Sequence, residues 1–463
     1  MSNEFPKGWA GTTLGDICSK PQYGWTSKAA KSGQIRYLRT SDISEGGIEW
    51  QKVPYCEEVP ADVEKYQVYP DDILVARAGS VGVSHRVRDI ACDAVFASYL
   101  IRFKALDGIE PKFVEFFLKS YEYWRAISEF AAGIAVPNVN ATKLASLGLP
   151  LAPINEQHRI VAKLEKLLEK VGACQKRLAK IPIILKRFRQ SVLAAACSGR
   201  LTPDWREKNP IAPADTAKLD TPFDVPETWR WVKLPETGEM SRGKSRHRPR
   251  NAAILYGGSY PFIQTGDIAQ SNGKITDHRQ TYNETGLAQS RLWPVRTVCI
   301  TIAANIAESA LLTYPACFPD SVVGIIANES MCVPEYIEYF IRVAKSDLST
   351  FAPATAQKNI NIAILSEVLV PLSPLEEQKE IVRRVEAFFA LADQIEARFL
   401  KAKTRVDQLT QSLLAKAFRG ELVPQDPNDE PASELLKRIK EERAKQEEGT
   451  KQKITKKKRG RAD

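Results

Sequence analysis

The sequence lacks the features of a membrane protein, a disulfide-bonded secreted protein or a zinc protein. No uninterrupted apolar run reaches membrane-spanning length, and the N-terminal residues do not form the basic and then apolar pattern of a signal peptide. The eight cysteines include no Cys-x-x-Cys pair, and no histidine lies at zinc-ligand spacing from a cysteine or another histidine. We therefore expect a cytoplasmic protein with reduced thiols and no metal site.

Signatures of catalysis are also missing. There is no Gly-x-Gly-x-x-Gly after a strand, no Asn/Asp-Pro-Pro-Tyr/Phe motif of an amino-methyltransferase, and no nuclease pattern of Asp-Pro followed by Glu-x-Lys. The four histidines are scattered and have no plausible serine or cysteine partner. These absences favour a binding protein over an enzyme.

One segment, Gly238-x-x-x-x-Gly243-Lys244-Ser245, does match the P-loop pattern letter for letter. A working P-loop lies between a buried strand and a helix, so that backbone N–H groups converge on a phosphate. Pro235 precedes the segment and Pro249 follows it, which disfavours both elements. We interpret the match as accidental.

The net charge of +10 is less informative than it first suggests. Residues 451–463 carry seven Lys or Arg and one Asp, a net of +6, which leaves +4 for the rest of the chain. A terminal run of lysines is usually a solvated tail that adds at most non-specific attraction to phosphate. The total charge alone does not identify a partner.

The chain contains an internal duplication. When the sequence is shifted by 221 residues, 130–203 align with 351–424 without a gap and share 24 identities in 74 positions. The segments upstream match more weakly: Trp9 corresponds to Trp229, and the stretch around Glu115 corresponds to that around Glu338. Each half is therefore a variable module followed by a well-preserved one.

The preserved module predicts a long helix in each half. Its apolar residues step by alternate fours and threes, which is the heptad pattern of a coiled coil. The predicted core positions are Ile160, Leu164, Leu167, Val171, Leu178, Leu185 and Phe188 in the first copy, and Ile381, Val385, Phe388, Ile395, Phe399, Val406 and Leu409 in the second. Pro153 and Pro374 suit a first helical turn, and Gly199 and Gly420 suit the C-terminal cap.

One residue conflicts with this pattern, because Pro182 lies inside the first predicted helix and should kink it. Lys403 occupies the matching place in the second copy. Ordinary bundle core is the alternative interpretation of such apolar stripes. Their length and duplication favour two helices packed on each other, antiparallel if a pseudo-twofold relates the halves.

The variable modules show short β-rich runs, glycine and proline punctuation and a few amphipathic stretches. We predict an α+β fold of two mixed α/β domains, one from each variable module, joined by two long antiparallel coiled-coil helices. The predicted boundaries are variable domains at 1–150 and 225–371, helices at 151–203 and 372–424, a proline-rich linker at 204–224, and a charged, partly disordered tail at 425–463 that includes a helical segment near Ser433–Gln446.

Corresponding loops of the two variable modules carry the side chains expected at a DNA interface, where cations anchor phosphates and other side chains reach base edges. The candidates are Tyr23, Trp25, Thr26, Ser27, Lys28, Arg39, Thr40, Arg77 and Ser80 in the first copy, and Arg242, Lys244, Arg246, Arg248, Thr265, Asn305, Gln357 and Lys358 in the second. A solvated basic loop is the alternative for 242–250. For the matching asparagines near 140 and 361, the alternative is that they cap their own backbone.

The sequence closely resembles the specificity subunits of Type I restriction-modification enzymes, particularly the enterobacterial branch. The resemblance rests on the Pro-Leu-x-Pro-x-x-Glu-Gln segments at 150–157 and 371–378 and on the segments at 181–190 and 409–422. It covers nearly the whole chain, and Pro182 fits the family pattern. It implies two target-recognition domains, each reading one half of an asymmetric bipartite duplex DNA site, and two helices that set the spacing between them.

The resemblance also implies partners and cofactors. Two modification subunits would supply S-adenosylmethionine chemistry on adenine, and restriction subunits would supply ATP- and Mg²⁺-dependent translocation and cleavage, with no cofactor in this chain. A stand-alone sequence-specific DNA-binding regulator is the main alternative. A self-sufficient methyltransferase or nuclease is a weaker one, because its motifs are missing.

Overall fold

A computed structural model describes residues 5–44, 47–131, 138–214, 221, 223–247, 249, 251–303, 305–350 and 360–459. The chain divides into two compact units. Unit 1 comprises residues 1–178 and 402–463, and unit 2 comprises residues 179–401. Each unit thus combines one predicted recognition domain with parts of both predicted helices.

Unit 1 is built on a four-stranded sheet in the order β2-β11-β8-β9. These strands are Gln22–Tyr23, Leu100–Phe103, Ile73–Ala76 and Ser84–Arg86. A second four-stranded sheet, β10-β4-β7-β3, and two two-stranded sheets, β1-β12 and β5-β6, accompany it. Their strands are β1 (Ala10–Thr13), β3 (Ala29–Ala30), β4 (Arg36–Leu38), β5 (Ile43–Ser44), β6 (Gly47–Ile48), β7 (Tyr55–Cys56), β10 (Ala94–Phe96) and β12 (Gly148–Leu151); the short helices are α1 (Leu14–Ile17), η1 (Thr40–Asp42), α2 (Val63–Tyr66), α3 (Pro111–Phe117), α4 (Tyr121–Ala131) and α5 (Ala141–Ala145).

Unit 2 repeats this plan with one more strand in its main sheet, which has the order β14-β20-β18-β19-β16. These strands are Gly238–Arg242, Val322–Ala327, Val298–Thr301, Ser309–Leu312 and Lys274–Ile275. The other elements are β13 (Arg230–Lys233) with β21 (Leu369–Leu372), β15 (Tyr256–Phe262) with β17 (Gln280–Tyr282), η2 (Leu234–Thr237), η3 (Ala253–Leu255), α9 (Thr265–Gln270), α10 (Glu284–Ala288), α11 (Pro334–Thr350) and α12 (Ile362–Ser366). The prediction of two mixed α/β copies is confirmed.

The preserved modules form helices, but the first copy is not one continuous helix as predicted. It forms α6 (Ile154–Leu178) and α7 (Ile181–Cys197), and Pro182 lies in the first turn of α7. Proline is favoured there because its missing N–H has no partner in a first turn. With Lys403 at the matching position, the second copy continues as the 44-residue helix α13 (Leu375–Phe418). Pro182, which would kink a continuous helix, therefore lies at the start of a second helix.

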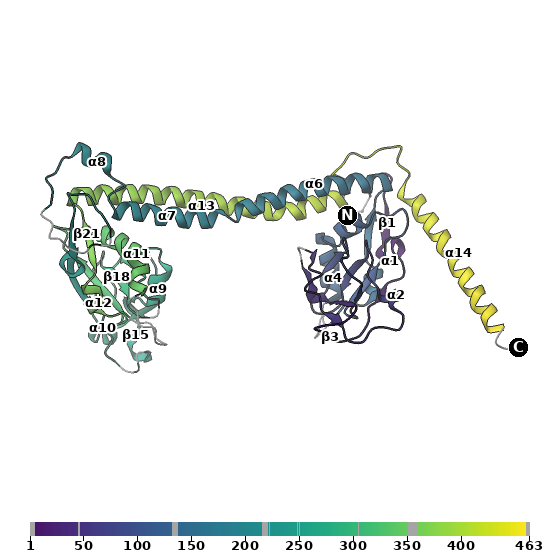
Figure 1. The fold of residues 1–463 in the computed structure, drawn as a ribbon, viewed down its shortest axis with the longest axis horizontal. Coiled ribbons are helices and arrows are strands. Elements are labelled where there is room, and N and C mark those ends of the chain that lie inside the picture. The colour runs from purple at the N-terminus through teal and green to yellow at the C-terminus, as the bar shows by residue number, and fades with distance from the viewer. Residues whose placement is uncertain are drawn as a thin grey trace. The chain divides into compact units, whose positions relative to one another are not determined.

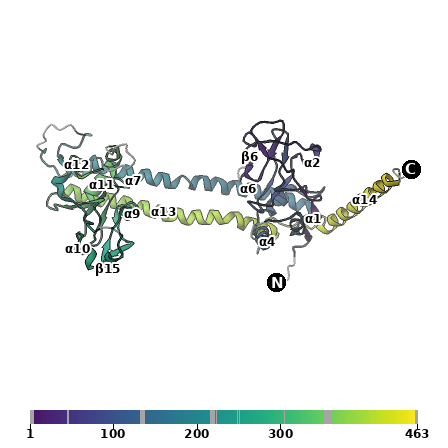
Figure 2. The ribbon, with the colours of Figure 1, turned by 90° about the horizontal axis from the view of Figure 1, so that it is seen from below.

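Within each unit the helices run antiparallel and side by side (Figures 1 and 2). In unit 1, Gln175 of α6 reaches Asp407, while Ile160 and Leu164 share a cluster with Leu414 and Phe418. In unit 2, Arg189 of α7 bonds Asp393 and Glu396.

The predicted core positions are not equally buried. The buried ones are Ile160, Leu164, Val171, Leu185, Ile381, Val385 and Phe399, and the half-buried ones are Leu167, Leu178, Phe188 and Val406. Phe388, Ile395 and Leu409 are exposed, so their assignment to the core is wrong. A pair of helices buries only one narrow strip of each, and positions at its margin stay accessible. Phe388 still touches the ring of Phe188 edge-on at 6.0 Å.

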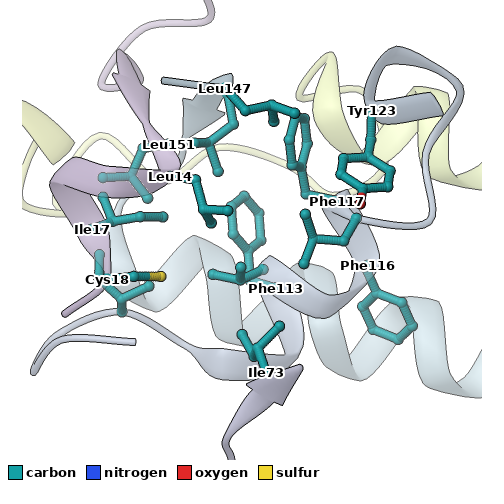
Figure 3. Packing of buried hydrophobic residues seen from close by; sticks show 14 of the residues in the cluster. Leu14, Ile17, Cys18, Ile73, Phe113, Phe116, Phe117, Tyr123, Leu147 and Leu151 are labelled. Atoms are coloured by element: carbon teal, nitrogen blue, oxygen red, sulfur yellow. The ribbon is translucent and has the colours of Figure 1, made fainter. Parts of the chain in front are cut away.

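The core of unit 1 draws its residues from segments far apart in the sequence (Figure 3). Phe113 and Phe117 of α3 lie beside Leu14, Leu147 and Leu151 in this cluster. The ring of Phe418, at the end of α13, packs edge-on against Phe113 and Phe117 at 5.1 and 5.3 Å. The end of the second copy's helix therefore completes the core of the first copy's domain.

The predicted linker and the predicted tail both contain a helix, and the sequence predicted only the one in the tail, near Ser433–Gln446. The predicted linker begins with α8 (Pro203–Lys208), which is docked because Asp204 pairs with Arg384 and Arg206 with Glu377. The predicted tail contains α14 (Ala432–Arg459), whose Ala432, Leu435 and Ile439 are buried in the unit 1 core. Their spacing places them on one helix face, a pattern that the high charge of the segment concealed. Among the described helices, none is long and apolar enough to cross a membrane.

A matched pair of buried glutamates distinguishes the two units. Glu115 contacts Arg86, Arg88 and Lys119; burial alone would raise its pKa, but these cations lower it to about 2. Burial raises the pKa of Glu338 to about 8, because the Ser309 hydroxyl and the more distant Arg342, at 3.7 Å, do not offset the loss of solvent. At neutral pH the first carboxyl is therefore charged, and the second is largely protonated.

We predict that Glu338→Gln stabilises the chain at pH 8 but has little effect at pH 5. Because the folded pKa lies above the unfolded one, the stability contribution of Glu338 is present below about pH 4.5 and is lost as pH rises toward 8. The difference between the two pH values should be about 2 to 4 kcal/mol, measured by calorimetric unfolding. Glu115→Gln is the contrast and should destabilise at both pH values, because it removes the buried charge that pairs with Arg86, Arg88 and Lys119. An equal effect of Glu338→Gln at pH 5 and pH 8 would contradict the raised pKa of Glu338.

Candidate nucleic-acid interface

The two units fix their loops with the same set of backbone hydrogen bonds. The N–H of Gly24 donates to Leu100 O at 3.2 Å, and that of Gly243 donates to Val322 O at 2.8 Å. In the same way, Arg77 N–H to Tyr99 O (2.9 Å) matches Ile302 N–H to Ser321 O (3.0 Å), and Val139 N–H to Arg77 O (3.0 Å) matches Ile360 N–H to Ile302 O (3.1 Å). Three loops therefore meet at the same place on each main sheet.

Glycine is required where the first of these loops crosses the sheet. A Cβ atom on Gly24 would lie 2.3 Å from the carbonyl oxygens of Phe96 and Ala97. On Gly243 it would lie 2.4 Å from those of Phe318 and Pro319. No side chain fits at such distances, so both copies need glycine here.

These bonds define which positions of the two copies correspond. Tyr23 corresponds to Arg242, Arg77 to Ile302, and Tyr99 to Ser321. The loop from Arg77 to Ser80 therefore corresponds to residues 302–305, which end at the predicted Asn305.

In the first copy, the structure brings Tyr23, Arg77 and Asn138 together. The guanidinium of Arg77 lies 4.8 Å from the centroid of the Tyr23 ring, and its Nε donates to Asn138 Oδ1 at 3.4 Å. The Tyr23 hydroxyl accepts from the N–H of Ala141 at 2.9 Å. Tyr99, which the sequence prediction missed, is 60% exposed and bonds Arg77 through its carbonyl.

Arg39 differs from Arg77 in being engaged by an acid. Its Nε and Nη2 donate to the two carboxylate oxygens of Asp42 at 2.9 and 2.8 Å. This hydrogen bonding raises the pKa of Arg39. Thr40 lies beside it in η1 and is half-buried. The pair shapes a short helical turn and leaves less of the Arg39 side chain available to a ligand.

Two other first-copy candidates hold their loop in place. Trp25 donates from Nε1 to Glu58 O at 2.7 Å, and Ser27 Oγ accepts from Glu58 N–H at 2.9 Å. The hydroxyl of buried Tyr37 donates to Trp25 O and accepts from Ser27 N–H, and burial raises its pKa. Trp25 and Ser27 therefore position the neighbouring exposed residues Thr26 and Lys28. Ser80 is exposed on the loop after β8.

In the second copy, polar side chains surround a hollow of about 480 Å³. It brings the predicted Thr265 together with the loop around Ser245. It is lined by Ser245, Asn251, Tyr256, Phe262, Gln264, Thr265, Gln280, Pro319 and Ser321. The Nε2 of Gln264 donates to Gln280 Oε1 at 2.7 Å. The sequence did not single out Gln280, because no repeat or charge pattern marks it.

The basic loop of the second copy lies beside this hollow. Arg242 is exposed at the end of β14, where its Nε donates to Asp320 O at 2.9 Å, and Lys244 and Arg246 are exposed after it. Asn305 is exposed in the loop after β18, and its carbonyl accepts from Glu308 N–H. Arg248, Gln357 and Lys358 lie outside the described residues.

The matching asparagines Asn140 and Asn361 cap the short helices α5 and α12. Their Oδ1 atoms accept from the N–H of Lys143 at 2.8 Å and of Ile364 at 2.9 Å. The alternative interpretation, in which these asparagines cap their own backbone, is correct. Asn138, two residues earlier, is the one that contacts Arg77.

Within the described residues, neither a cluster of metal-ligating side chains nor a phosphate-binding loop at the P-loop match is present. These residues contain no group of three or more His, Cys, Asp or Glu side chains able to hold a metal ion. Residues 238–242 of the P-loop match form strand β14, paired antiparallel with β20, so their N–H groups do not converge on a phosphate. The interpretation of that match as accidental is confirmed.

The recognition domains are attached to the helices by matching contacts. The indole N–H of Trp9 donates to Glu156 at 3.0 Å, and that of Trp229 donates to Glu377 at 2.9 Å. The side-chain oxygens of Gln157 and Gln378 accept from the N–H groups of Glu110 and Val333, at 3.0 and 2.8 Å. The preserved Glu-Gln pairs are thus anchors between helix and domain.

Comparison with known proteins agrees with this duplicated arrangement. A family model described as the Type I restriction modification DNA specificity domain matches residues 6–182 and again 226–402. The chain is 31% identical to the Type I restriction enzyme EcoBI specificity subunit of Escherichia coli, over 89% of this chain and 86% of that protein. It is 32% identical to the EcoDI specificity subunit of Escherichia coli, over 90% of this chain and 95% of that protein.

A solved structure shows the same fold at lower sequence identity. The HsdS subunit from Thermoanaerobacter tengcongensis matches with a TM-score of 0.61 and 20% identity, over 91% of this chain and 99% of that chain. At this identity the likeness concerns the fold alone.

We predict that replacing Arg242, Lys244, Arg246 and Arg248 with alanine weakens DNA binding and flattens its dependence on salt. Each lost phosphate contact should reduce the slope of log K against log salt concentration by about 0.9. Fluorescence anisotropy with a labelled duplex, measured from low to high salt, would give the slope. Alanine at the exposed Lys437, Lys440 and Lys445 of α14 removes like charges elsewhere and should change the slope less. An unchanged slope in the loop variant would exclude this loop from the interface.

Proposed function

The chain belongs to the Type I restriction-modification DNA specificity family and is a recognition subunit rather than a catalytic one, and we propose that each of its units reads one half of an asymmetric, two-part duplex site. One observation carries the proposal. The same backbone bonds present unlike side chains, with Tyr23, Arg77 and Tyr99 in unit 1 standing where unit 2 has Arg242, Ile302 and Ser321. Two equivalent backbone arrangements that carry different side chains are suited to two half-sites of different sequence.

We further propose that the helices bind modification subunits. Apolar side chains remain exposed on α7 and α13 of unit 2: Ile183, Ile184, Phe388, Leu391 and Ile395, with Ile184 at 59%. A row of exposed apolar residues along a helix pair is a typical protein-binding surface. Because the chain is duplicated, we expect two modification subunits for each copy of this chain, and restriction subunits joined to that complex.

The chemistry of modification and cleavage would belong to those partners. S-adenosylmethionine would serve adenine methylation, and ATP with Mg²⁺ would serve translocation and cleavage. Because the proposed substrate is cellular DNA, we expect the complex to act in the cytoplasm. The alternative of a stand-alone regulator is not favoured, because the relatives are specificity subunits of restriction enzymes. A regulator would bind its specific site tightly without any partner.

Co-expression with the cognate modification subunit should yield a complex of two modification subunits to one of these chains. We predict that Ile184→Asp with Ile395→Asp weakens this assembly, because a charge is placed in an interface that must exclude water. Their effect on folding should be small, within about 0.5 kcal/mol, since both side chains are already exposed. Light scattering after size exclusion would measure the stoichiometry. Ile254→Asp, at an exposed residue of the short helix η3 in unit 2, is the matched control and should assemble normally. Unimpaired assembly of the double variant would remove this surface from the proposal.

Lengthening the helices should change the gap between the half-sites and leave the half-sites themselves unchanged. One heptad inserted after Gln175 of α6 and one before Asp407 of α13 preserves the facing contact between these residues, because the helices are antiparallel and both insertions then lie on the same side of it. Seven residues add about 10 Å of helix, or about three base pairs of duplex. Selection of binding sites from random duplexes would show the new gap. A change in the preferred bases instead would contradict the separation of reading from spacing.

A further inference from the structure

Arg77 is held in an arrangement that the other candidate cations of unit 1 lack. Its backbone is fixed on both sides, since its N–H bonds Tyr99 O and its carbonyl accepts from Val139 N–H. Its side chain lies over the Tyr23 ring, with Nε on Asn138. Among the described residues, the terminal nitrogens Nη1 and Nη2 have no hydrogen-bond or ion-pair partner. By contrast, Arg39 is bound to Asp42, and Lys28 is an exposed point charge.

The Tyr23 ring on which Arg77 stacks is itself held in place. The Tyr23 hydroxyl accepts from Ala141 N–H, so the ring cannot turn freely, and Tyr23 is paired with Ile101 in the main sheet. A guanidinium stacked on an aromatic ring loses little freedom when it binds a ligand. The two terminal nitrogens form a planar fork, which matches two adjacent acceptors on one edge of a ligand.

The major-groove edge of guanine offers such a pair of acceptors, O6 and N7. Adenine and cytosine each present a donor there, and thymine presents one acceptor and a methyl group. Resting on the proposed function, we infer that Arg77 is a specificity-determining residue that reads a guanine in the half-site bound by unit 1. Unit 2 has no counterpart, because Ile302 stands in the place of Arg77 and is 2% exposed.

The test uses the complex with the modification subunit and a pool of random duplexes. The wild-type complex should select a two-part site that includes a guanine in one half. Affinities are then measured for that duplex and for duplexes with A·T at each G·C position. Wild type should prefer guanine at one position by about 5- to 150-fold. Arg77→Ala should lose this preference, and Arg77→Lys should lose most of it while keeping the charge. The preferences in the other half should not change.

Variants of Tyr23 distinguish a loss of base discrimination from a loss of folding. Tyr23→Leu removes the stacking surface and should weaken the preference at the same position, whereas Tyr23→Phe keeps the ring and should retain most of it. Melting temperature and complex assembly are measured for all four variants. If Arg77→Ala does not fold, Arg77→Lys and Tyr23→Leu decide the question.

Three results would overturn the inference. A uniform loss of affinity for every duplex, with a lower salt slope, would make Arg77 a phosphate contact. Unchanged discrimination at every position, or a loss at a position other than guanine, would exclude it as the reader of that base. A wild-type complex that selects no two-part site is a different outcome, since it would refute the proposed function itself.

Discussion

A hydrogen bond from a tryptophan indole to a buried glutamate ties each recognition domain to its helix, and much else depends on it. Glu156 and Glu377 are both about 1% exposed or less, so each carboxylate needs its partners. The carboxylate of Glu377 accepts hydrogen bonds from Trp229, Thr202 and Arg206. That of Glu156 accepts one from Trp9, and burial raises the pKa of Glu156. With the adjoining glutamines bonded to domain backbone, these contacts leave little tolerance for change, which explains why this part of the duplication is well preserved.

The loops are under a different constraint. Their positions depend on backbone hydrogen bonds and on two glycines, Gly24 and Gly243, and these impose nothing on most of the neighbouring side chains. A half-buried arginine that stacks on a tyrosine and a buried isoleucine can therefore occupy equivalent places. Under the proposed function, backbone that is fixed while the side chains vary would let two copies of one domain select different DNA. It would also let the same pair of helices bind two identical partners on an asymmetric site.

The sequence predicted the duplication, the helices and the mixed α/β domains because each leaves a regular pattern: repeated identities, heptads and alternating β-rich runs. It did not predict the break before Pro182, since a proline within a helix and one that starts a helix look alike in the sequence. It placed Phe388, Ile395 and Leu409 in the core because spacing does not show how wide the contact strip is. The association of Tyr23, Arg77 and Asn138 depends on long-range sheet pairing, and no local pattern indicates it. The opposite protonation of Glu115 and Glu338 depends on which cations the fold brings near them.

We propose, centrally, that the two units hold their loops by equivalent backbone hydrogen bonds but carry different side chains, and that each unit recognises one half of an asymmetric site. Mapping methylated adenines across the genome of a host that carries the complete system tests this most directly. The account predicts a single motif of two unlike half-sites separated by a gap of fixed length and unspecified sequence. A palindromic motif, or one uninterrupted run of specified bases, would contradict it.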